Sequence, residues 1–386
     1  MKILLAPDSF KGTMSSREVI SHLSAAASEH FSPLTIVALP IADGGEGTVE
    51  ALVTATGGTY RERQVAGPRL TGVAARYGII NGDTAVIEMA QASGLPLLSH
   101  SERNPCLTTT YGTGELLRAA LDEGLRKIIV GIGGSATNDG GIGCAQALGV
   151  SFTDAEGREV GPGGGELRRI ARIDPTNLDV RLRDTNVTVI CDVNNPLTGV
   201  RGATRVFGPQ KGATPAMLDE LEAGMLHYAG LLEQTCRYDV GNTPGSGAAG
   251  GLGAALLAFC GAKLKPGIET VLDLVAFERL IADVDLVVTG EGRIDEQTAY
   301  GKVPVGIARR CAANGVSVVA VVGSIGSGAG ATYSFGIDSI MSAICAPMSL
   351  EEAMSQPAER LREAADRMFR FIKVGMRLAR KEQRGG

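Results

Sequence analysis

The sequence predicts an α/β protein built on parallel sheets, and three observations support this fold class. Short apolar runs alternate with stretches of helical pattern, a loop bearing glycine or aspartate follows most of these runs, and the same order occurs near both ends of the chain. Strand–loop–helix units favour parallel sheets, because two parallel strands need a long crossover connection. The 386 residues are enough for two domains of ordinary size.

The N-terminal region supplies the first two units. Residues 2–6 predict a strand, and a helix follows over about 15–29. Ser15 and Glu18 fit a capping box, in which each side chain accepts a backbone N–H of the other residue. Residues 34–39 predict a second strand, and a glycine-rich loop leads from it into a helix that runs through residue 55.

The middle of the chain is richer in β-structure. Asn81-Gly82 is a strong hairpin signal between two of the predicted strands. Residues 150–185 read as strand and turn, and helices follow at 214–234 and 248–260. The predicted strands of this region are 61–66, 73–80 and 84–90.

Strand–loop–helix units return at 127–148, 284–313 and 316–325. We therefore expect residues 1–58 and 250–386 to form one doubly wound domain, with a second α/β domain, 59–249, inserted into it. The ligand is expected in the cleft between the domains, at the carboxyl ends of parallel strands.

Bulk properties exclude several classes of protein. The formal net charge of −5 argues against nucleic-acid binding, which usually needs a basic patch. The seven cysteines form no C-x-x-C pair, so reduced thiols in a cytosol are expected. There is no apolar run of about 18 residues and no signal-peptide pattern, so we predict a cytoplasmic protein without membrane partners. The oligomeric state cannot be read from these features.

Carboxylates gather in the loops that follow the predicted strands, where the carboxyl ends of a parallel sheet meet. Close acids repel one another unless a metal ion, basic residues or protonation offsets their charge. Lys11, Arg293 and Lys302 lie in the same loops, and Lys211 is a further candidate. The acids are Asp8, Asp43, Glu46, Asp139, Asp192, Glu291 and Asp295.

Acids, bases and glycines together favour phosphoryl transfer, in which backbone N–H groups cradle phosphates and cations neutralise developing charge. The loop GIGGSATNDGGIG, residues 131–143, is the most glycine-rich of them. It is not a complete dinucleotide fingerprint, since Ala136 stands where the third glycine belongs, and the chain has no P-loop motif. The four histidines lie outside all of these loops, so a Ser-His-Asp mechanism lacks an obvious base.

Structural roles remain open for several of these residues. Asn138 or Asp139 could simply cap the next helix. Arg293 lies between two acids and could form a local salt bridge with them, and Lys302 could be a solvated lysine before the first-turn Pro304.

The motifs together resemble the class I glycerate kinases, a family of bacterial glycerate 2-kinases. They span nearly the whole chain in the family order, and together they are far more specific than any one alone. The matching stretches are APDSFKGT (6–13), PIADGGEGT (40–48), 131–141, CDVNNPL (191–197) and TGEGRID (289–295) with Gln297 and Thr298. The resemblance implies ATP- and Mg²⁺-dependent phosphorylation of D-glycerate to 2-phosphoglycerate. It also implies a flavodoxin-like domain with a second α/β domain inserted.

From the residues and the resemblance we expect the following roles. Asp192 orients or deprotonates the attacking hydroxyl, with Lys11 and Asp8 beside it. Glu291 helps to hold Mg²⁺, and Asp43 or Glu46 could share this role. Glycerate is expected to contact Asp43, Gly44, Gly45, Glu46, Arg293 and Asp295. ATP is expected to contact Gly133, Gly134, Ser135, Asn138, Asp139 and Lys302.

Other activities remain open on the sequence alone. Phosphorylation of the 3-hydroxyl, a hydroxy-acid dehydrogenase of similar architecture, and a non-catalytic sensor of acidic metabolites are the alternatives. The incomplete nicotinamide fingerprint argues against the dehydrogenase, and the number of acids argues against the sensor.

Overall fold

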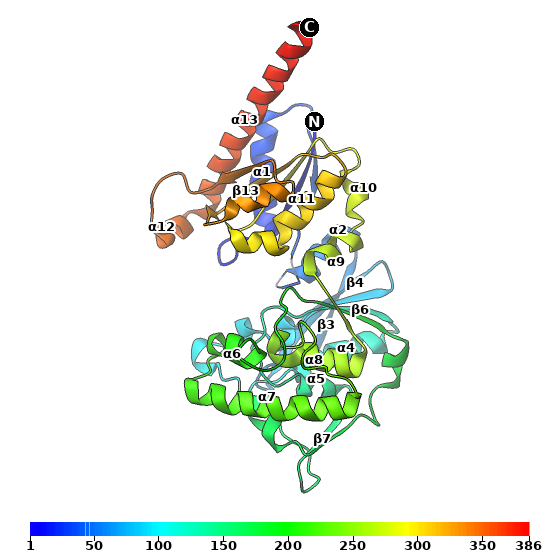
Figure 1. The fold of residues 1–386 in the computed structure, drawn as a ribbon. Coiled ribbons are helices and arrows are strands. Elements are labelled where there is room, and N and C mark those ends of the chain that lie inside the picture. Colours follow the sequence, from blue (N-terminus) through cyan, green and yellow to red (C-terminus); the bar gives the residue numbers. More distant parts are fainter. Residues whose placement is uncertain (43, 46, 386) are drawn as a thin grey trace. The chain divides into compact units, whose positions relative to one another are not determined.

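Strands from both ends of the chain share one five-stranded sheet in the computed structural model, which describes residues 1–42, 44, 45 and 47–385 (Figure 1). Its order is β15-β13-β11-β1-β2, and all neighbours are parallel. Numbered by chain order within this sheet, that is the 2-1-3-4-5 order of flavodoxin-like folds. The predicted fold class is confirmed. The strands are β1 (Lys2–Pro7), β2 (Thr35–Ala38), β11 (Leu286–Gly290), β13 (Val318–Val322) and β15 (Ser339–Ser342).

Helices cover both faces of this sheet. α1 (Ser16–His30) and α13 (Pro357–Gly385) pack side by side and bury Ile3 and Leu5 in one core (Figure 1). α11 (Val303–Ala313) contacts β11 and β13. The predicted capping box of α1 is present, with the Ser15 N–H donating to Glu18 Oε2 over 2.8 Å.

Shorter elements complete this part of the chain. They are α9 (Gly267–Leu274), α10 (Phe277–Ile281), β12 (Arg293–Ile294), the 3₁₀ helix η7 (Glu296–Tyr300), β14 (Ser324–Ile325), the 3₁₀ helix η8 (Ala329–Phe335) and α12 (Leu350–Ser355).

A second sheet has six strands in the order β10-β9-β6-β5-β4-β3. The first four of these are parallel neighbours, and β4 pairs antiparallel with both β5 and β3. The predicted hairpin is confirmed, because Asn81 and Gly82 both have positive φ, 53° and 76°, as a type I′ turn requires. The strands are β3 (Thr59–Ala66), β4 (Gly72–Ile80), β5 (Thr84–Glu88), β6 (Lys127–Gly131), β9 (Asn186–Ile190) and β10 (Lys263–Lys265).

The helices of this second part pack on both faces of its sheet. α4 (Tyr111–Asp122) and α8 (Leu252–Cys260) share a core with Ile128 and Val189, and α2 (Thr48–Thr56) packs on β4 and β5. The other elements are α3 (Ala90–Ser93), α5 (Ile142–Ala147), β7 (Ser151–Thr153), β8 (Arg172–Asp174), α6 (Ala203–Phe207), α7 (Pro215–Cys236) and the 3₁₀ helices η1 (Leu95–Leu97), η2 (His100–Glu102), η3 (Gly164–Arg169), η4 (Val180–Asp184), η5 (Pro209–Lys211) and η6 (Ala248–Gly251).

The chain separates into two units whose boundaries differ from the predicted ones. One unit is Met1–Asp43 with Ile268–Gly386, and the other is Gly44–Gly267. Residues 44–58 and 250–267 were predicted to lie in the first domain. They belong to the second unit because α2 packs Val49 and Val53 onto Gly78 of β4, and α8 packs Leu252 and Leu256 into that unit's core. The helix α4 was not expected at all.

Within the part of the chain that the structure describes, we find no helix with the length and apolar character needed to cross a membrane.

Candidate active site

The first unit brings acids and bases together where β1 and β11 end. The Asp8 N–H donates to the Gly290 carbonyl over 2.8 Å, so the two strands end side by side. This is the point at which the strand order of a 2-1-3-4-5 sheet reverses, and ligands bind there in such folds. Asp8 is buried, and its Oδ1 accepts the Ser9 N–H at 2.7 Å.

The loops after these two strands also touch. A side-chain carbon added at Gly292 would lie 3.6 Å from Cα of Phe10 and 3.7 Å from the nitrogen of Lys11. The predicted meeting of the APDSFKGT and TGEGRID loops is therefore present, and the Lys11 side chain is exposed there.

Glu291 is a buried acid with a defined set of partners. Its Oε1 accepts the Thr298 hydroxyl over 2.6 Å, and its Oε2 lies 3.6 Å from Lys302 Nζ. Burial raises the pKa of the Glu291 carboxyl, while the Thr298 hydrogen bond and the Lys302 charge oppose that rise. Lys302 is the N-cap residue of α11, so its ammonium group and the free N–H groups of a helix start favour an anion at the same place.

Arg293 forms the local salt bridge that the sequence analysis left open. Its Nε lies 3.1 Å from Asp295 Oδ2, and its side chain remains 65 % exposed. Asp295 in turn caps η7, since its Oδ1 accepts the Gln297 N–H at 3.0 Å. The pair leaves most of the guanidinium accessible, so a local and a ligand-binding role are compatible for Arg293.

In the second unit, Gly44 and Gly45 lie against the carboxyl end of the sheet. A side-chain carbon at Gly131 would come within 2.6 Å of the Gly44 carbonyl oxygen, and one at Gly133 within 2.7 Å of Cα of Gly45. Close backbone approach therefore explains these glycines without any ligand. The predicted site residues Asp43 and Glu46 lie outside the described residues.

The loop over residues 131–143 is buried except at Gly133 and Gly134. Gly134 is exposed with a φ of +74°, and Gly133 is half-buried. Asn138 is buried, and its Nδ2 donates to the Thr204 hydroxyl over 3.0 Å. Gly134 can thus approach a ligand, whereas the Gly133 N–H donates to the Gly44 carbonyl over 3.4 Å and Ser135 is buried. The Asn138 side chain holds the loop from within.

Asp139 is fully buried, and its carboxylate is filled by protein donors. Oδ2 accepts the Thr110 N–H at 2.8 Å and the Thr110 hydroxyl at 2.9 Å, and Oδ1 accepts the Gly141 N–H at 3.1 Å. Burial raises the pKa of the Asp139 carboxyl, and these hydrogen bonds oppose that rise. This geometry favours an internal support for Asp139 over the ATP contact that the sequence analysis expected.

Lys211 is the other buried charged group of this region. It is 1 % exposed, and its Nζ donates to the Thr137 carbonyl over 2.6 Å. Burial lowers the pKa of Lys211 to about 7, and the charge of Asp139 opposes that change. Lys211 therefore ties η5 to the glycine-rich loop instead of facing solvent.

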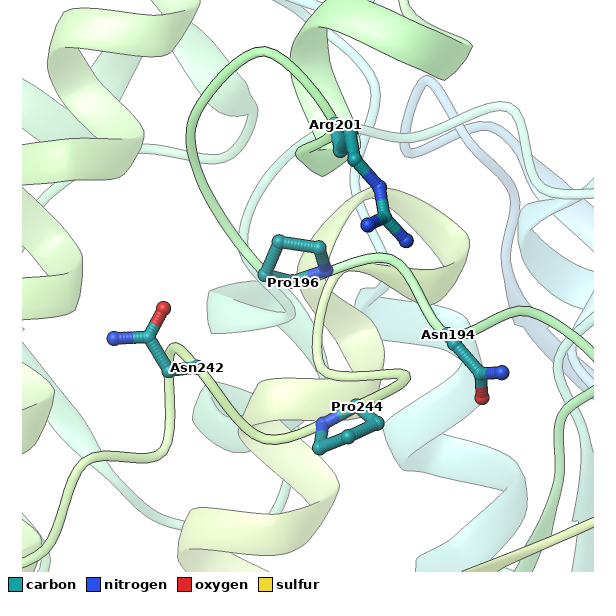
Figure 2. Close-up of a pocket in the computed structure, with 5 residues that line it drawn as sticks. All are labelled: Asn194, Pro196, Arg201, Asn242 and Pro244. Atoms are coloured by element: carbon teal, nitrogen blue, oxygen red, sulfur yellow. The ribbon is translucent and has the colours of Figure 1, made fainter.

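Asp192 follows β9 and is exposed, and its Oδ1 accepts the Gly267 N–H at 2.7 Å. Just beyond it the chain forms a cavity of about 550 Å³. The lining residues are Asn194, Pro196, Arg201, Asn242 and Pro244 (Figure 2).

Sequence reasoning missed part of this region. Nothing in the pattern around Arg201 or Asn242 indicated a site, because both lie in loops far from any strand end. Glu88 was also missed. It is the last residue of the strand β5, a position similar to that of Asp8 just after β1. It is buried, and its Oε1 accepts the Val49 N–H at the start of α2 over 2.6 Å.

Fold and site define a flavodoxin-like α/β protein with an acid–lysine cluster at the reversal point of its sheet. The model of the glycerate kinase family matches residues 3–373. The chain is 49% identical to "Glycerate kinase" of Bacillus subtilis over 97% of this chain and 98% of that protein. It is 47% identical to "Glycerate 2-kinase" of Escherichia coli over 98% of this chain and all of that protein.

The solved structures agree. A crystal structure assigned to a glycerate kinase 2 from Salmonella typhimurium LT2 superposes with a TM-score of 0.85 at 46% identity, over 98% of this chain and 99% of that one. The chain belongs to the glycerate kinase family.

Proposed function

We propose that this chain transfers the γ-phosphoryl group of ATP to the 2-hydroxyl of D-glycerate, giving 2-phosphoglycerate and ADP. The observation that carries the proposal is the 47% identity to a glycerate 2-kinase over 98% of the chain. The cluster at the reversal point of the first sheet supplies suitable chemistry, because a lysine at a helix start can neutralise charge on a transferring phosphoryl group.

Each charged group has a distinct part in this proposal. Lys302 binds a phosphate oxygen and is held in place by Glu291, whose Oε2 lies 3.6 Å from it. Lys11 and Arg293 are both exposed and bind the glycerate carboxylate. Asp192 orients the hydroxyl or accepts its proton as it attacks phosphorus. The backbone of Gly134, the exposed glycine of the 131–143 loop, approaches the phosphates.

The described residues offer few ligands for the Mg²⁺ that accompanies ATP. Among the described residues, no three acids, histidines or cysteines lie close enough to form a metal cage. Mg²⁺ on ATP needs only one or two carboxylates besides phosphate and water, and it would neutralise phosphate charge. Glu291 fits this role poorly, because Thr298 and Lys302 already engage its two oxygens. The steps proposed above therefore depend on the chain's own residues.

The activity is tested with purified protein, ATP, Mg²⁺ and D-glycerate in an assay of ADP release. We expect release that depends on glycerate, and a loss of kcat of about 10²-fold in Asp192→Asn if its carboxylate accepts the proton. Full turnover in Asp192→Asn would remove Asp192 as the base. Absence of ADP release with glycerate and with other short hydroxy acids would overturn the kinase proposal, and NADH binding would then favour the dehydrogenase.

A further inference from the structure

The cavity beside Asp192 is built from two loops that are tied together. The Leu197 N–H donates to the Gly241 carbonyl over 2.9 Å, and the Gly247 N–H donates to the Asn195 carbonyl over 3.0 Å. Within the first loop, Asn195 Nδ2 donates to the carbonyl of Arg201 over 2.7 Å. These bonds fix the backbone that carries Arg201, so the cavity is a preformed feature of the second unit.

Arg201 brings an unneutralised positive charge to this cavity. Among the described residues its guanidinium has no ion pair and no hydrogen bond, whereas Arg205 on the next helix pairs with Asp219 at 2.7 Å. None of the lining residues is acidic. In the view of Figure 2 the Arg201 guanidinium lies between Pro196 and Asn194. A free guanidinium of this kind favours an anion with paired oxygens, such as a phosphate or a carboxylate.

The size of the cavity favours an organic phosphate over a small carboxylic acid. Its volume of about 550 Å³ falls in the usual range for sites of drug-sized organic ligands. A three-carbon acid would fill only a small part of it. The rings of Pro196 and Pro244 add apolar surface that a small acid would not use, and that a base and ribose would. Asn242 is held by Asp239, to which its Nδ2 donates over 2.6 Å, so it presents a fixed amide at the rim.

We propose that this cavity binds the nucleoside phosphate, with Arg201 on a phosphate or ribose oxygen and the proline rings against the base and sugar. The inference rests on the proposed kinase function and names the nucleotide subsite within it. The location agrees with it, because Asn194 follows Asp192 by only two residues, after the end of the parallel strand β9.

ADP binding measured by calorimetry tests the proposal without turnover. We expect Arg201→Met to raise the Kd for ADP at least about tenfold, which corresponds to about 1.4 kcal/mol. Arg183→Met is the matched control, since Arg183 is an exposed arginine of the same unit that does not line the cavity. It should leave the Kd unchanged.

A fluorescence reporter provides an independent measurement, because the chain contains no tryptophan. Asn194→Trp places a single indole at the rim of the cavity, and Val180→Trp places one at a site that is 63 % exposed and does not line the cavity. ADP should change the emission of the first variant and leave that of the second unchanged. Adding Arg201→Met to Asn194→Trp should weaken the response.

The outcomes separate this proposal from the kinase function. Glycerate-dependent ADP release with an unchanged Kd for ADP in Arg201→Met would overturn the nucleotide subsite alone. A raised KM for glycerate with an unchanged KM for ATP would assign Arg201 to the substrate carboxylate and also overturn it. If the wild-type protein binds no ADP and releases none from ATP, both proposals fail.

Discussion

Glu291 and Asp139 each follow a parallel strand in a glycine-rich loop, yet their surroundings are opposite. Glu291 has one protein hydroxyl and one partly exposed lysine as partners. Asp139 is fully buried; its Oδ2 accepts the Thr110 N–H and hydroxyl, and its Oδ1 accepts the Gly141 N–H. The comparison teaches that an acid after a strand can either organise a cation for a ligand or support the loop itself. Substitutions at the two positions should therefore change different measurable quantities.

The largest effect is expected for stability in Asp139→Ala. The substitution leaves at least two buried donors without an acceptor, at about 1–3 kcal/mol each, so we expect a loss of more than about 3 kcal/mol in the free energy of unfolding. Urea unfolding measures this change. Asp219→Ala, in the same unit and on an exposed ion pair, should cost less than about 1 kcal/mol. Equal losses in the two variants would refute the supporting role.

Lys302→Met should change activity instead of stability. The lysine side chain is 39 % exposed, so its removal should cost little folding free energy. If Lys302 neutralises a phosphoryl oxygen, kcat/KM for ATP should fall about 10²-fold or more. Lys263→Met is the control, because Lys263 is an exposed lysine at the start of β10, the end of that strand away from Asp192. Wild-type kinetics in Lys302→Met would remove it from the site.

Lys211 should make the folding stability of the chain depend on pH. Its pKa is lowered to about 7 in the folded chain, while an unfolded lysine titrates near 10.4. Between these values the unfolded state binds more protons, so the Lys211 contribution makes folding more favourable as pH rises, by at most about 1.4 kcal/mol per pH unit.

Unfolding at pH 7 and pH 9 tests this sign in the wild type and in Lys211→Met. The stability of the wild type relative to the variant should increase at the higher pH. A difference that is constant or decreases would show that Lys211 is not held with a lowered pKa.

The smallest effect on stability is expected for Arg293→Met. Its pair with Asp295 is largely exposed, so the loss in folding free energy should be below about 1 kcal/mol. If the guanidinium also binds the substrate carboxylate, KM for glycerate should rise while KM for ATP changes little. An unchanged KM for glycerate would show that Arg293 forms the local salt bridge with Asp295 and does not bind the substrate.

The sequence predicts strand ends well and loop interiors poorly. The meeting of the Asp8 and Glu291 loops was predictable, because each follows an apolar run and parallel strands end at one edge. The burial of Asp139 was not, since its donor Thr110 lies 29 positions away in a loop without a pattern. The predicted domain boundaries differ from those of the structure for the same reason. The packing partner of α2 is Gly78, and nothing near residues 48–56 indicates that strand.

The central claim is that this chain phosphorylates the 2-hydroxyl of glycerate. The most direct measurement is a ³¹P NMR spectrum of the product that the purified protein forms from D-glycerate and ATP with Mg²⁺. The account predicts the resonance of 2-phosphoglycerate together with those of ADP. A spectrum with 3-phosphoglycerate would contradict the proposed position of transfer, and one with unchanged ATP would contradict the kinase function itself.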